Sequence, residues 1–332
     1  MIEFPKRLSL ARLPTPIQRL ERFADIPEEV EIWVKRDDLT GVELTGNKIR
    51  KLEFLLADAL DQGCDTLITC GGLQSNHCRA TALLGARLGL KVHLLLRGDE
   101  PSVLEGNLFL DHLCGATVSY VPVSDWPNHA TMAEELQDHY RKKSRKAYYI
   151  PVGGSDEMGL WGYIAACQEL QSDFERLNFN PDYIVLATGS GGTQGGLVLG
   201  KALMDLSPRV VAFNVSDDGA YFDRKIRADV SLWKRRFNCE TDETKLEIIT
   251  AEGYLGRGYG VASDPVYDCI RDLARSDGII LDPVYTGKAF HGLVQELKRG
   301  ADGQLPGART ILFIHTGGLF GVFPHAKHFK LD

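Results

Sequence analysis

The fold of this chain is decided by the stretch Tyr183-Ile184-Val185-Leu186-Ala187-Thr188-Gly189-Ser190-Gly191-Gly192-Thr193-Gln194-Gly195-Gly196. Its first five residues are apolar or aromatic, which is typical of a strand buried on both faces of a parallel sheet. The glycines that follow predict a tight turn, after which a helix begins. A strand, a turn and a helix in this order form the unit from which parallel sheets are built.

The same alternation of strand and helix patterns extends over most of the chain. We expect strands at residues 31–35, 66–70, 91–96, 117–121, 147–150, 210–215, 248–249, 278–281 and 311–315. Besides the helix after Gly191, we expect helices at residues 48–60, 75–88, 104–113, 132–140, 159–170, 220–236, 265–274 and 287–298. This order predicts an α/β fold of two open, twisted, mostly parallel sheets with helices on both faces.

Length and composition limit the class of protein. With 332 residues the chain suffices for about two domains, and residues 151–155 (Pro-Val-Gly-Gly-Ser) are the clearest crossing between them. The net charge of −7 argues against nucleic acid or an anionic membrane as the main partner. No run reaches the roughly 20 apolar residues of a membrane span, and we expect no secretory signal. The seven scattered cysteines fit free thiols, so we expect a cytoplasmic protein.

The turn at residues 188–196 has the features of an anion site. Glycines let backbone N–H groups approach a negative charge, which the start of the next helix favours. The spacing Gly-x-Gly-x-x-x-Gly differs from the Gly-x-Gly-x-x-Gly fingerprint of dinucleotide sites. Such sites also have an acidic residue about 20 positions further on that binds the ribose, and the nearest candidate, Asp217, lies somewhat beyond that position. A phosphate monoester fits this turn best, with Ser190 and Thr193 as added donors. A dinucleotide site and a turn that binds nothing are the alternatives.

Gly71-Gly72-Leu73-Gln74-Ser75-Asn76-His77 is a second turn from a strand into a helix. Gln74, Ser75 and Asn76 bring amide and hydroxyl groups to a positive helix end, where a carboxylate or a phenolate-like oxygen would bind. The alternative is a serine N-cap with a polar first turn. Parallel sheets bind ligands beyond the carboxyl ends of their strands, so this turn should meet those at 188–196, 283–288 and 315–318.

Leu44-Thr45-Gly46-Asn47-Lys48-Ile49-Arg50-Lys51 delivers a lysine to the start of a helix. Thr45 and Asn47 are both candidate N-caps. The positive helix end disfavours the ammonium form of Lys48 and should lower its pKa, which suits a nucleophilic amine. The alternative is a solvated basic first turn. We expect Arg50 and Lys51 only to flank Lys48.

Two tyrosines lie in turns that no core pattern explains. Tyr285 follows the strand expected at 278–281, and Tyr259 stands between two glycines. Such tyrosines line sites or donate protons, although packed tyrosines are more common. His315, His325 and His328 lack a carboxylate or cysteine that would complete a metal site, so we expect none.

Together these motifs resemble the pyridoxal-phosphate enzymes of the tryptophan-synthase-β type, which have fold type II. They most resemble the branch that contains D-cysteine desulfhydrase and 1-aminocyclopropane-1-carboxylate (ACC) deaminase. The matching runs cover nearly the whole chain in family order: 32–38, 46–53, 71–77, 151–155, 189–193, 281–288 and 313–318. The resemblance implies a large cofactor-binding domain at 1–45 and 159–332, a small domain at 46–158, and a homodimer.

The resemblance also assigns roles to residues. Lys48 would form the Schiff base with the cofactor, and Asn76 would hydrogen-bond the cofactor's phenolic oxygen. Ser75 would face the substrate carboxylate and, like Lys48, take part in catalysis. The remaining cofactor contacts would be Gly189, Ser190, Gly191, Gly192, Thr193 and Thr316, and the remaining substrate contacts Gln74, Asn76 and the catalytic tyrosines Tyr259 and Tyr285.

Two positions discriminate within the branch. The deaminase pattern has a glutamate after the tyrosine, to pair with the pyridine nitrogen, and a leucine after the last histidine. This chain has Thr286 and Thr316 there, as in the desulfhydrase pattern. A neutral hydroxyl makes the ring a weaker electron sink, which suits loss of a good β-leaving group better than opening a cyclopropane.

The leading hypothesis is therefore a pyridoxal-phosphate lyase that converts D-cysteine to pyruvate, ammonia and sulfide by α,β-elimination. ACC deaminase and cysteate sulfo-lyase are the alternatives with the same fold. An NAD-dependent oxidoreductase and a non-catalytic pyridoxal-phosphate-binding protein are the alternatives from other classes. The segment 221–252 departs from the family pattern, so its role is open.

Overall fold

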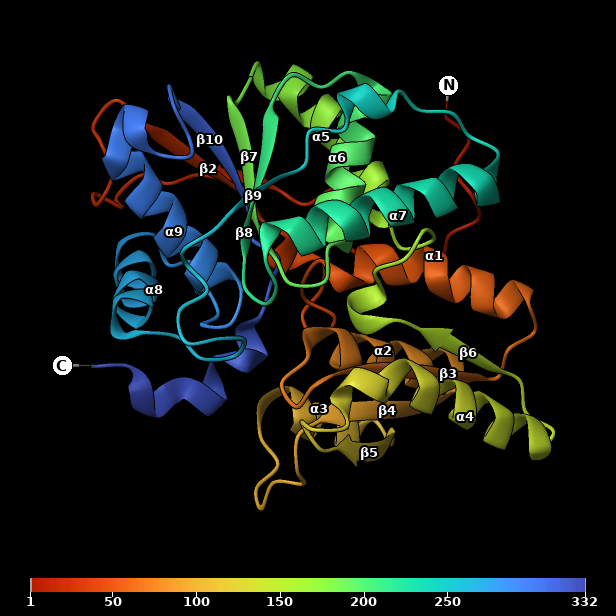
Figure 1. Cartoon of the computed structure of the whole chain (residues 1–332). Coiled ribbons are helices and arrows are strands. Elements are labelled where there is room, and N and C mark those ends of the chain that lie inside the picture. Colours follow the sequence, from red (N-terminus) through yellow and green to blue (C-terminus); the bar gives the residue numbers. More distant parts are fainter. Residues whose placement is uncertain (1, 332) are drawn as a thin grey trace.

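Two sheets form the framework of the computed structural model, which describes residues 2–331 (Figure 1). The larger sheet contains, in spatial order, β1 (Ile17–Arg19), β2 (Glu31–Lys35), β10 (Thr310–Ile314), β7 (Tyr183–Thr188), β8 (Arg209–Asn214) and β9 (Ile249–Ala251). The smaller sheet contains β5 (Thr117–Val121), β4 (Lys91–Arg97), β3 (Thr66–Gly72) and β6 (Ala147–Ile150). All neighbouring strands are parallel except β1 and β2, which are antiparallel. The α/β fold with two mostly parallel sheets is confirmed.

The α-helices of the described residues are α1 (Lys48–Asp61), α2 (Asn76–Leu88), α3 (Gly106–Leu113), α4 (His129–Lys142), α5 (Trp161–Leu177), α6 (Gly192–Met204), α7 (Gly219–Phe237), α8 (Asp264–Asp277) and α9 (Thr286–Arg299). Short 3₁₀ turns lie at Asp37–Leu39, Trp126–Asn128, Val152–Gly154, Glu243–Lys245, Gly300–Asp302, Leu319–Gly321 and Phe323–His328. None of the helices in residues 2–331 has the length and apolar character needed to cross a membrane.

The strand expected at residues 278–281 is wrong. Gly278 ends α8 in the left-handed region (φ 69°), and residues 279–281 join no strand ladder. The carbonyl of Ile280 lies 3.0 Å from Nε2 of His315, so a side chain takes the place of a neighbouring strand. Ile279 and Leu281 are buried while Ile280 is exposed, and this alternation explains why the sequence resembled a strand.

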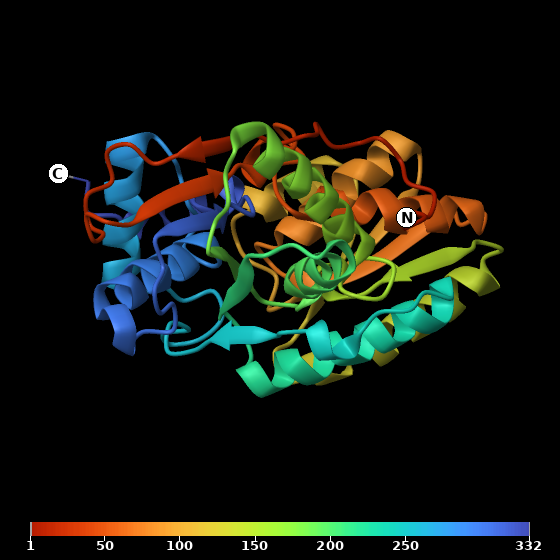
Figure 2. The same cartoon turned by 90° about the horizontal axis from the view of Figure 1, so that it is seen from above.

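Three apolar clusters fill the spaces between the layers. The largest joins both sheets, because it contains Leu67 of β3, Leu94 of β4 and Leu186 of β7. A second cluster lies under α8 and α9 on the other face of the larger sheet, and a third lies between the smaller sheet and α4. Figure 2 shows α5, α6 and α7 beside the larger sheet. The residue limits of the two domains stay a prediction.

A buried ion-pair network ties α1 to the larger sheet. Arg50 of α1 pairs with Asp37 at 2.7 Å and with Glu169 of α5 at 2.9 Å. Lys35, at the end of β2, pairs with Glu169 and with Asp173, each at 2.6 Å. Arg50 therefore anchors the helix that begins at Lys48.

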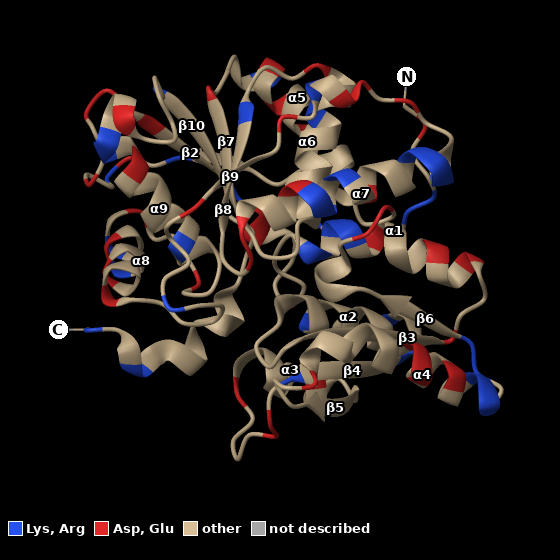
Figure 3. Cartoon of the chain, in the orientation of Figure 1, with Lys and Arg blue, Asp and Glu red and all other residues tan. Residues whose placement is uncertain are grey.

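Figure 3 shows Lys and Arg residues and Asp and Glu residues distributed along the ribbon of both sheets' layers, with the two signs interspersed.

Candidate active site

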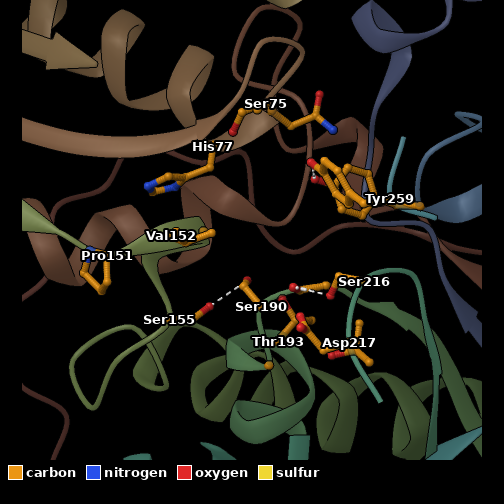
Figure 4. Close-up of a pocket in the computed structure, with 18 of the residues that line it drawn as sticks. Ser75, His77, Pro151, Val152, Ser155, Ser190, Thr193, Ser216, Asp217 and Tyr259 are labelled. Carbon is orange, nitrogen blue, oxygen red and sulfur yellow. Dashed lines mark hydrogen bonds between the residues drawn. The ribbon is translucent and has the colours of Figure 1, made fainter. Parts of the chain in front are cut away.

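A cavity of about 470 Å³ lies between the two sheets. Its wall includes residues from all four turns that the sequence placed at the carboxyl ends of strands: Ser75, Ser190, Tyr285 and Thr316 are examples. In Figure 4, Ser75 and His77 lie on one side of the cavity and Ser190 and Thr193 on the opposite side. The starts of α1, α2 and α6 all reach this cavity, so it collects three positive helix ends.

Lys48 lines the cavity as the first residue of α1 and is partly exposed there. Desolvation by the surrounding protein lowers the pKa of its amine to about 8, and a weak influence of Cys78 acts in the opposite direction. Burial therefore lowers the pKa of Lys48, in the direction that the sequence led us to expect. Asn47 occupies the N-cap position of α1, but its side chain does not cap the helix, since its Nδ2 donates to Thr193 Oγ1 at 2.9 Å. Thr45 is not the N-cap, and its Oγ1 donates to the carbonyl of Asp38.

The glycine turn between β7 and α6 is held by Ser155, a residue whose role the sequence did not reveal. Ser155 Oγ accepts from Gly192 N at 3.2 Å and from Lys51 Nζ at 3.1 Å. Because both acceptor positions of Ser155 are then used, its own proton must go to Ser190 Oγ, 2.8 Å away. The proton of Ser190 is thereby left to bind a ligand inside the turn.

Lys51 is a fully buried cation with no carboxylate within ion-pairing distance among residues 2–331. Burial and the neighbouring Lys48 lower its pKa well below the usual range. A Cβ built on Gly192 would lie 2.8 Å from Lys51 Nζ, so this amine touches the glycine turn. The expectation that Lys51 only flanks Lys48 is wrong, because the helix turns its side chain towards the anion site. An anion bound there would satisfy its charge.

Ser75 caps α2 and faces the cavity at the same time. Its Oγ accepts from Cys78 N at 3.2 Å, and its hydroxyl proton stays available. Asn76 begins α2 and also lines the cavity. The two interpretations of this turn, an N-cap and a ligand site, are therefore compatible.

The structure places Gln74 outside the cavity wall. Its Nε2 donates to the carbonyl of Glu105 at 3.0 Å, and its Oε1 accepts from Asn107 N at 2.9 Å. These bonds tie the turn to the start of α3. Gln74 therefore lies apart from the other expected substrate contacts. The sequence could not distinguish it from Ser75 and Asn76, because all three residues of the turn are polar.

His77 has a defined tautomer. Thr69 Oγ1 donates to the carbonyl of Ile150 at 2.8 Å, so it must accept from His77 Nε2, also 2.8 Å away. Nδ1 is then an unprotonated acceptor, and it is buried without a partner among the described residues. Burial, together with Lys48 and Lys51, keeps the pKa of His77 well below its usual range. The ring is neutral and adds no charge to the cavity.

Tyr259 and Tyr285 meet through their hydroxyl groups, and their rings lie edge to face with centroids 5.8 Å apart. Burial raises the pKa of both hydroxyls. Both tyrosines therefore stay protonated near neutral pH, so they can donate a proton but do not act as bases. The structure brings together this pair, Lys48 and Ser75 around one cavity.

The two threonines differ in position. Thr316 lines the cavity, whereas Thr286 does not. Thr286 Oγ1 accepts from Asp282 N at 2.8 Å and donates to Asp282 Oδ1 at 2.7 Å. Asp282 also accepts from Val284 N and Tyr285 N, which commits it to the start of α9.

Of the described acidic residues only Asp217 lines the cavity, beside Ser216 and Thr193 (Figure 4).

Comparison with known proteins agrees with this chemistry. The family described as "Pyridoxal-phosphate dependent enzyme" matches residues 8–317. The chain is 43% identical over 327 residues to an Arabidopsis thaliana protein named bifunctional D-cysteine desulfhydrase/1-aminocyclopropane-1-carboxylate deaminase, mitochondrial, and the match covers 95% of this chain and 79% of that protein.

Solved structures show the same relationship. The crystal structure of an ACC deaminase homologue is similar with a TM-score of 0.86 and 36% identity, over 97% of this chain and 95% of that one. The crystal structure of O-ureido-L-serine synthase has a TM-score of 0.67 at 19% identity, over 94% of this chain and 90% of that one, and shows the shared fold alone. The dinucleotide alternative is left without support.

The residues around the cavity fit pyridoxal phosphate. The glycine turn, Ser190 and the unpaired Lys51 supply donors and positive charge for a phosphate. Lys48 supplies an amine of lowered pKa for an aldehyde. A Cβ at Gly192 would come within 2.5 Å of Ser155 Oγ, so only glycine lets the turn stay this close.

Proposed function

Because the chain belongs to the D-cysteine desulfhydrase and ACC deaminase family of pyridoxal-phosphate-dependent enzymes, we propose that it catalyses α,β-elimination on D-cysteine. One water is consumed, and the products are pyruvate, ammonia and hydrogen sulfide. The observation that carries this proposal is the absence of an acid at the two discriminating positions: Thr286 follows Tyr285 and is committed to Asp282, and the neutral Thr316 lines the cavity. A pyridine nitrogen without an acidic partner makes the cofactor ring a weaker electron sink, which suits loss of a good β-leaving group better than opening of a cyclopropane ring.

Bound pyridoxal phosphate supplies the electron sink for this reaction. The amine of Lys48, with its pKa of about 8, is the base that accepts the α-proton. Ser75 and the start of α2 bind the substrate carboxylate, because Ser75 keeps a free hydroxyl proton beside a positive helix end. These contacts fix the substrate so that its α C–H bond faces the lysine.

The C–S bond at the β-carbon breaks, the sulfur departs as hydrosulfide (HS⁻), and a proton from the tyrosine pair completes hydrogen sulfide. Tyr259 and Tyr285 suit this role because both hydroxyls stay protonated near neutral pH and are bonded to each other. When one hydroxyl gives up its proton, the other stabilises the resulting phenolate by a hydrogen bond. A proton from solvent then converts the phenolate back to the tyrosine hydroxyl.

ACC deamination is the second candidate, since the names of the Arabidopsis protein and of the similar crystal structure include it. The two activities give different products: sulfide and pyruvate from D-cysteine, and 2-oxobutanoate and ammonia from ACC. Purified protein should be assayed with both substrates, with L-cysteine and with D-cysteate. Sulfide release from D-cysteine supports the proposal, and 2-oxobutanoate release without sulfide contradicts it.

A further inference from the structure

Arg97 stands beside the turn that is expected to bind the substrate. It is the last residue of β4, and its Cα pairs with that of Gly72 in β3. A Cβ built on Gly72 would lie 3.4 Å from the ring of Tyr259, so the turn, Arg97 and the tyrosine pair meet at one end of the cavity.

The guanidinium of Arg97 lies between two aromatic rings. It is 5.1 Å from the ring centroid of Tyr259 and 5.6 Å from that of Trp126. Cation–π contacts hold a guanidinium in place without using its N–H donors. Within residues 2–331 no carboxylate pairs with Arg97, and its donors have no hydrogen-bond acceptor. It is thus a positioned cation whose donors are free.

The other cations around the cavity are accounted for. Lys48 serves the cofactor aldehyde, and Lys51 faces the glycine turn. Lys225 pairs with Asp229 and donates to the carbonyl of Ser155 at 3.0 Å. Among the described residues that line the cavity, Arg97 is the cation that remains, and it lies beside the turn that carries Ser75.

We propose that Arg97 binds an anionic oxygen group of the amino-acid substrate. This inference rests on the proposed function, because it assumes that an amino acid enters the cavity. The planar guanidinium suits a carboxylate or a sulfonate, since its parallel donors match two oxygens. The group is either the α-carboxylate, shared with Ser75, or an anion on the β-carbon. The guanidinium would recognise either group by the same paired hydrogen bonds, and the experiment below distinguishes the α-carboxylate from the β-anion.

The test uses ligands that bind without elimination. D-alanine carries the carboxylate but no leaving group, D-alaninamide lacks the negative charge, and D-cysteate adds a second one. Each is titrated into cofactor-loaded protein, and binding is followed by the change in the visible absorption band. The variants are Arg97→Gln, which removes the charge, and Arg97→Lys, which keeps the charge but not the planar fork. Arg87→Gln, on the exposed end of α2, is the matched control.

If Arg97 holds the α-carboxylate, Arg97→Gln weakens D-alanine binding on the order of ten- to a hundredfold and leaves D-alaninamide unchanged. If it holds a β-anion, only D-cysteate binding weakens by that factor. Equal affinities in wild type and Arg97→Gln, or an equal loss for the uncharged amide, would overturn the proposal. The proposal would also be overturned if the wild-type protein bound neither D-alanine nor L-alanine.

The design keeps this proposal separate from the proposed function. Binding of D-alanine is measured without turnover, so an enzyme that fails to release sulfide from D-cysteine still tests Arg97. If L-alanine binds in place of D-alanine, the substrate stereochemistry is wrong, and the titrations proceed with the L-series. An unchanged absorption band in unliganded Arg97→Gln shows that the cofactor site is intact.

Discussion

The side chain of Asn107 donates from Nδ2 to Oδ1 of Asn76 at 3.0 Å, which fixes the direction of an amide in the active site. The direction follows from Arg79, whose guanidinium can only donate and does so to Asn107 Oδ1 at 3.1 Å. Asn76 therefore turns its own NH₂ group towards ligands. An amide so oriented binds an acceptor such as the phenolate oxygen of pyridoxal phosphate. Asn107, on α3, acts as a positioning residue.

Replacing Asn107 by leucine, of similar volume, should weaken cofactor binding roughly tenfold, because Asn76 is then free to turn its oxygen towards the phenolate. The dissociation constant of pyridoxal phosphate and the position of its visible band measure this effect. Asn180→Leu, at an exposed site, serves as the control. A merely structural role would lower stability but leave the band where it is.

The lowered pKa of Lys48 predicts how the cofactor-free protein takes up pyridoxal phosphate. Only the neutral amine attacks the aldehyde, and its pKa is about 8. The initial rate at which the visible band forms should therefore rise with pH through about 8 and level off above it. A rate that keeps rising to pH 10 would mean that Lys48 has the pKa of an exposed lysine. Lys48→Ala should form no band at any pH.

Lys51 should bind the phosphate group of the cofactor. Lys51→Met removes the charge and keeps most of the side-chain volume, so we expect affinity for pyridoxal phosphate to fall about ten- to a hundredfold. Affinity for pyridoxal, which has no phosphate, should change little. Measuring both ligands on both proteins separates a phosphate contact from general damage to the site. A parallel loss for the two ligands would contradict the assignment.

The sequence predicted those parts of the site that depend on local order along the chain. Strand, turn and helix patterns located the glycine turn and the turn at Ser75, because parallel strands bring their carboxyl ends to one edge. It could not locate contacts that depend on how the two sheets pack. Lys51 and Ser155 meet at the glycine turn only in the folded chain, and Gln74 turns away because α3 offers it partners.

The buried network around Arg50 should contribute strongly to stability. Arg50→Met leaves Asp37 and Glu169 buried without their main partner, which should lower the free energy of unfolding by roughly 3–5 kcal/mol. Denaturant unfolding of the cofactor-free protein measures this loss without ligand effects. Arg141→Met, which breaks an exposed pair with Asp138, should cost less than about 1 kcal/mol. Equal losses in the two variants would contradict the prediction.

The same network sets the direction of acid denaturation. Burial alone would raise the pKa of Asp37 and of Glu169, but Arg50 brings both below their usual values. Their stabilising contribution is therefore complete above the pKa values of the unfolded chain and is lost as the pH falls through the lowered ones. The stability difference between wild type and Arg50→Met should shrink as the pH falls below about 4. If the difference instead grows as the pH falls, Asp37 and Glu169 are not the ionised partners of Arg50.

Tyr259→Phe should slow elimination in proportion to how much the leaving group needs a proton. Sulfide leaves D-cysteine more easily when it is protonated, so kcat should fall about a hundredfold or more when the hydroxyl bonded to Tyr285 is removed. Chloride needs no proton, so 3-chloro-D-alanine should be turned over at nearly the wild-type rate. Comparing kcat for the two substrates in wild type, Tyr259→Phe and Tyr285→Phe tests the acid role directly. An equal loss for both substrates would assign the tyrosines to substrate positioning, because a misplaced substrate reacts slowly whatever group departs.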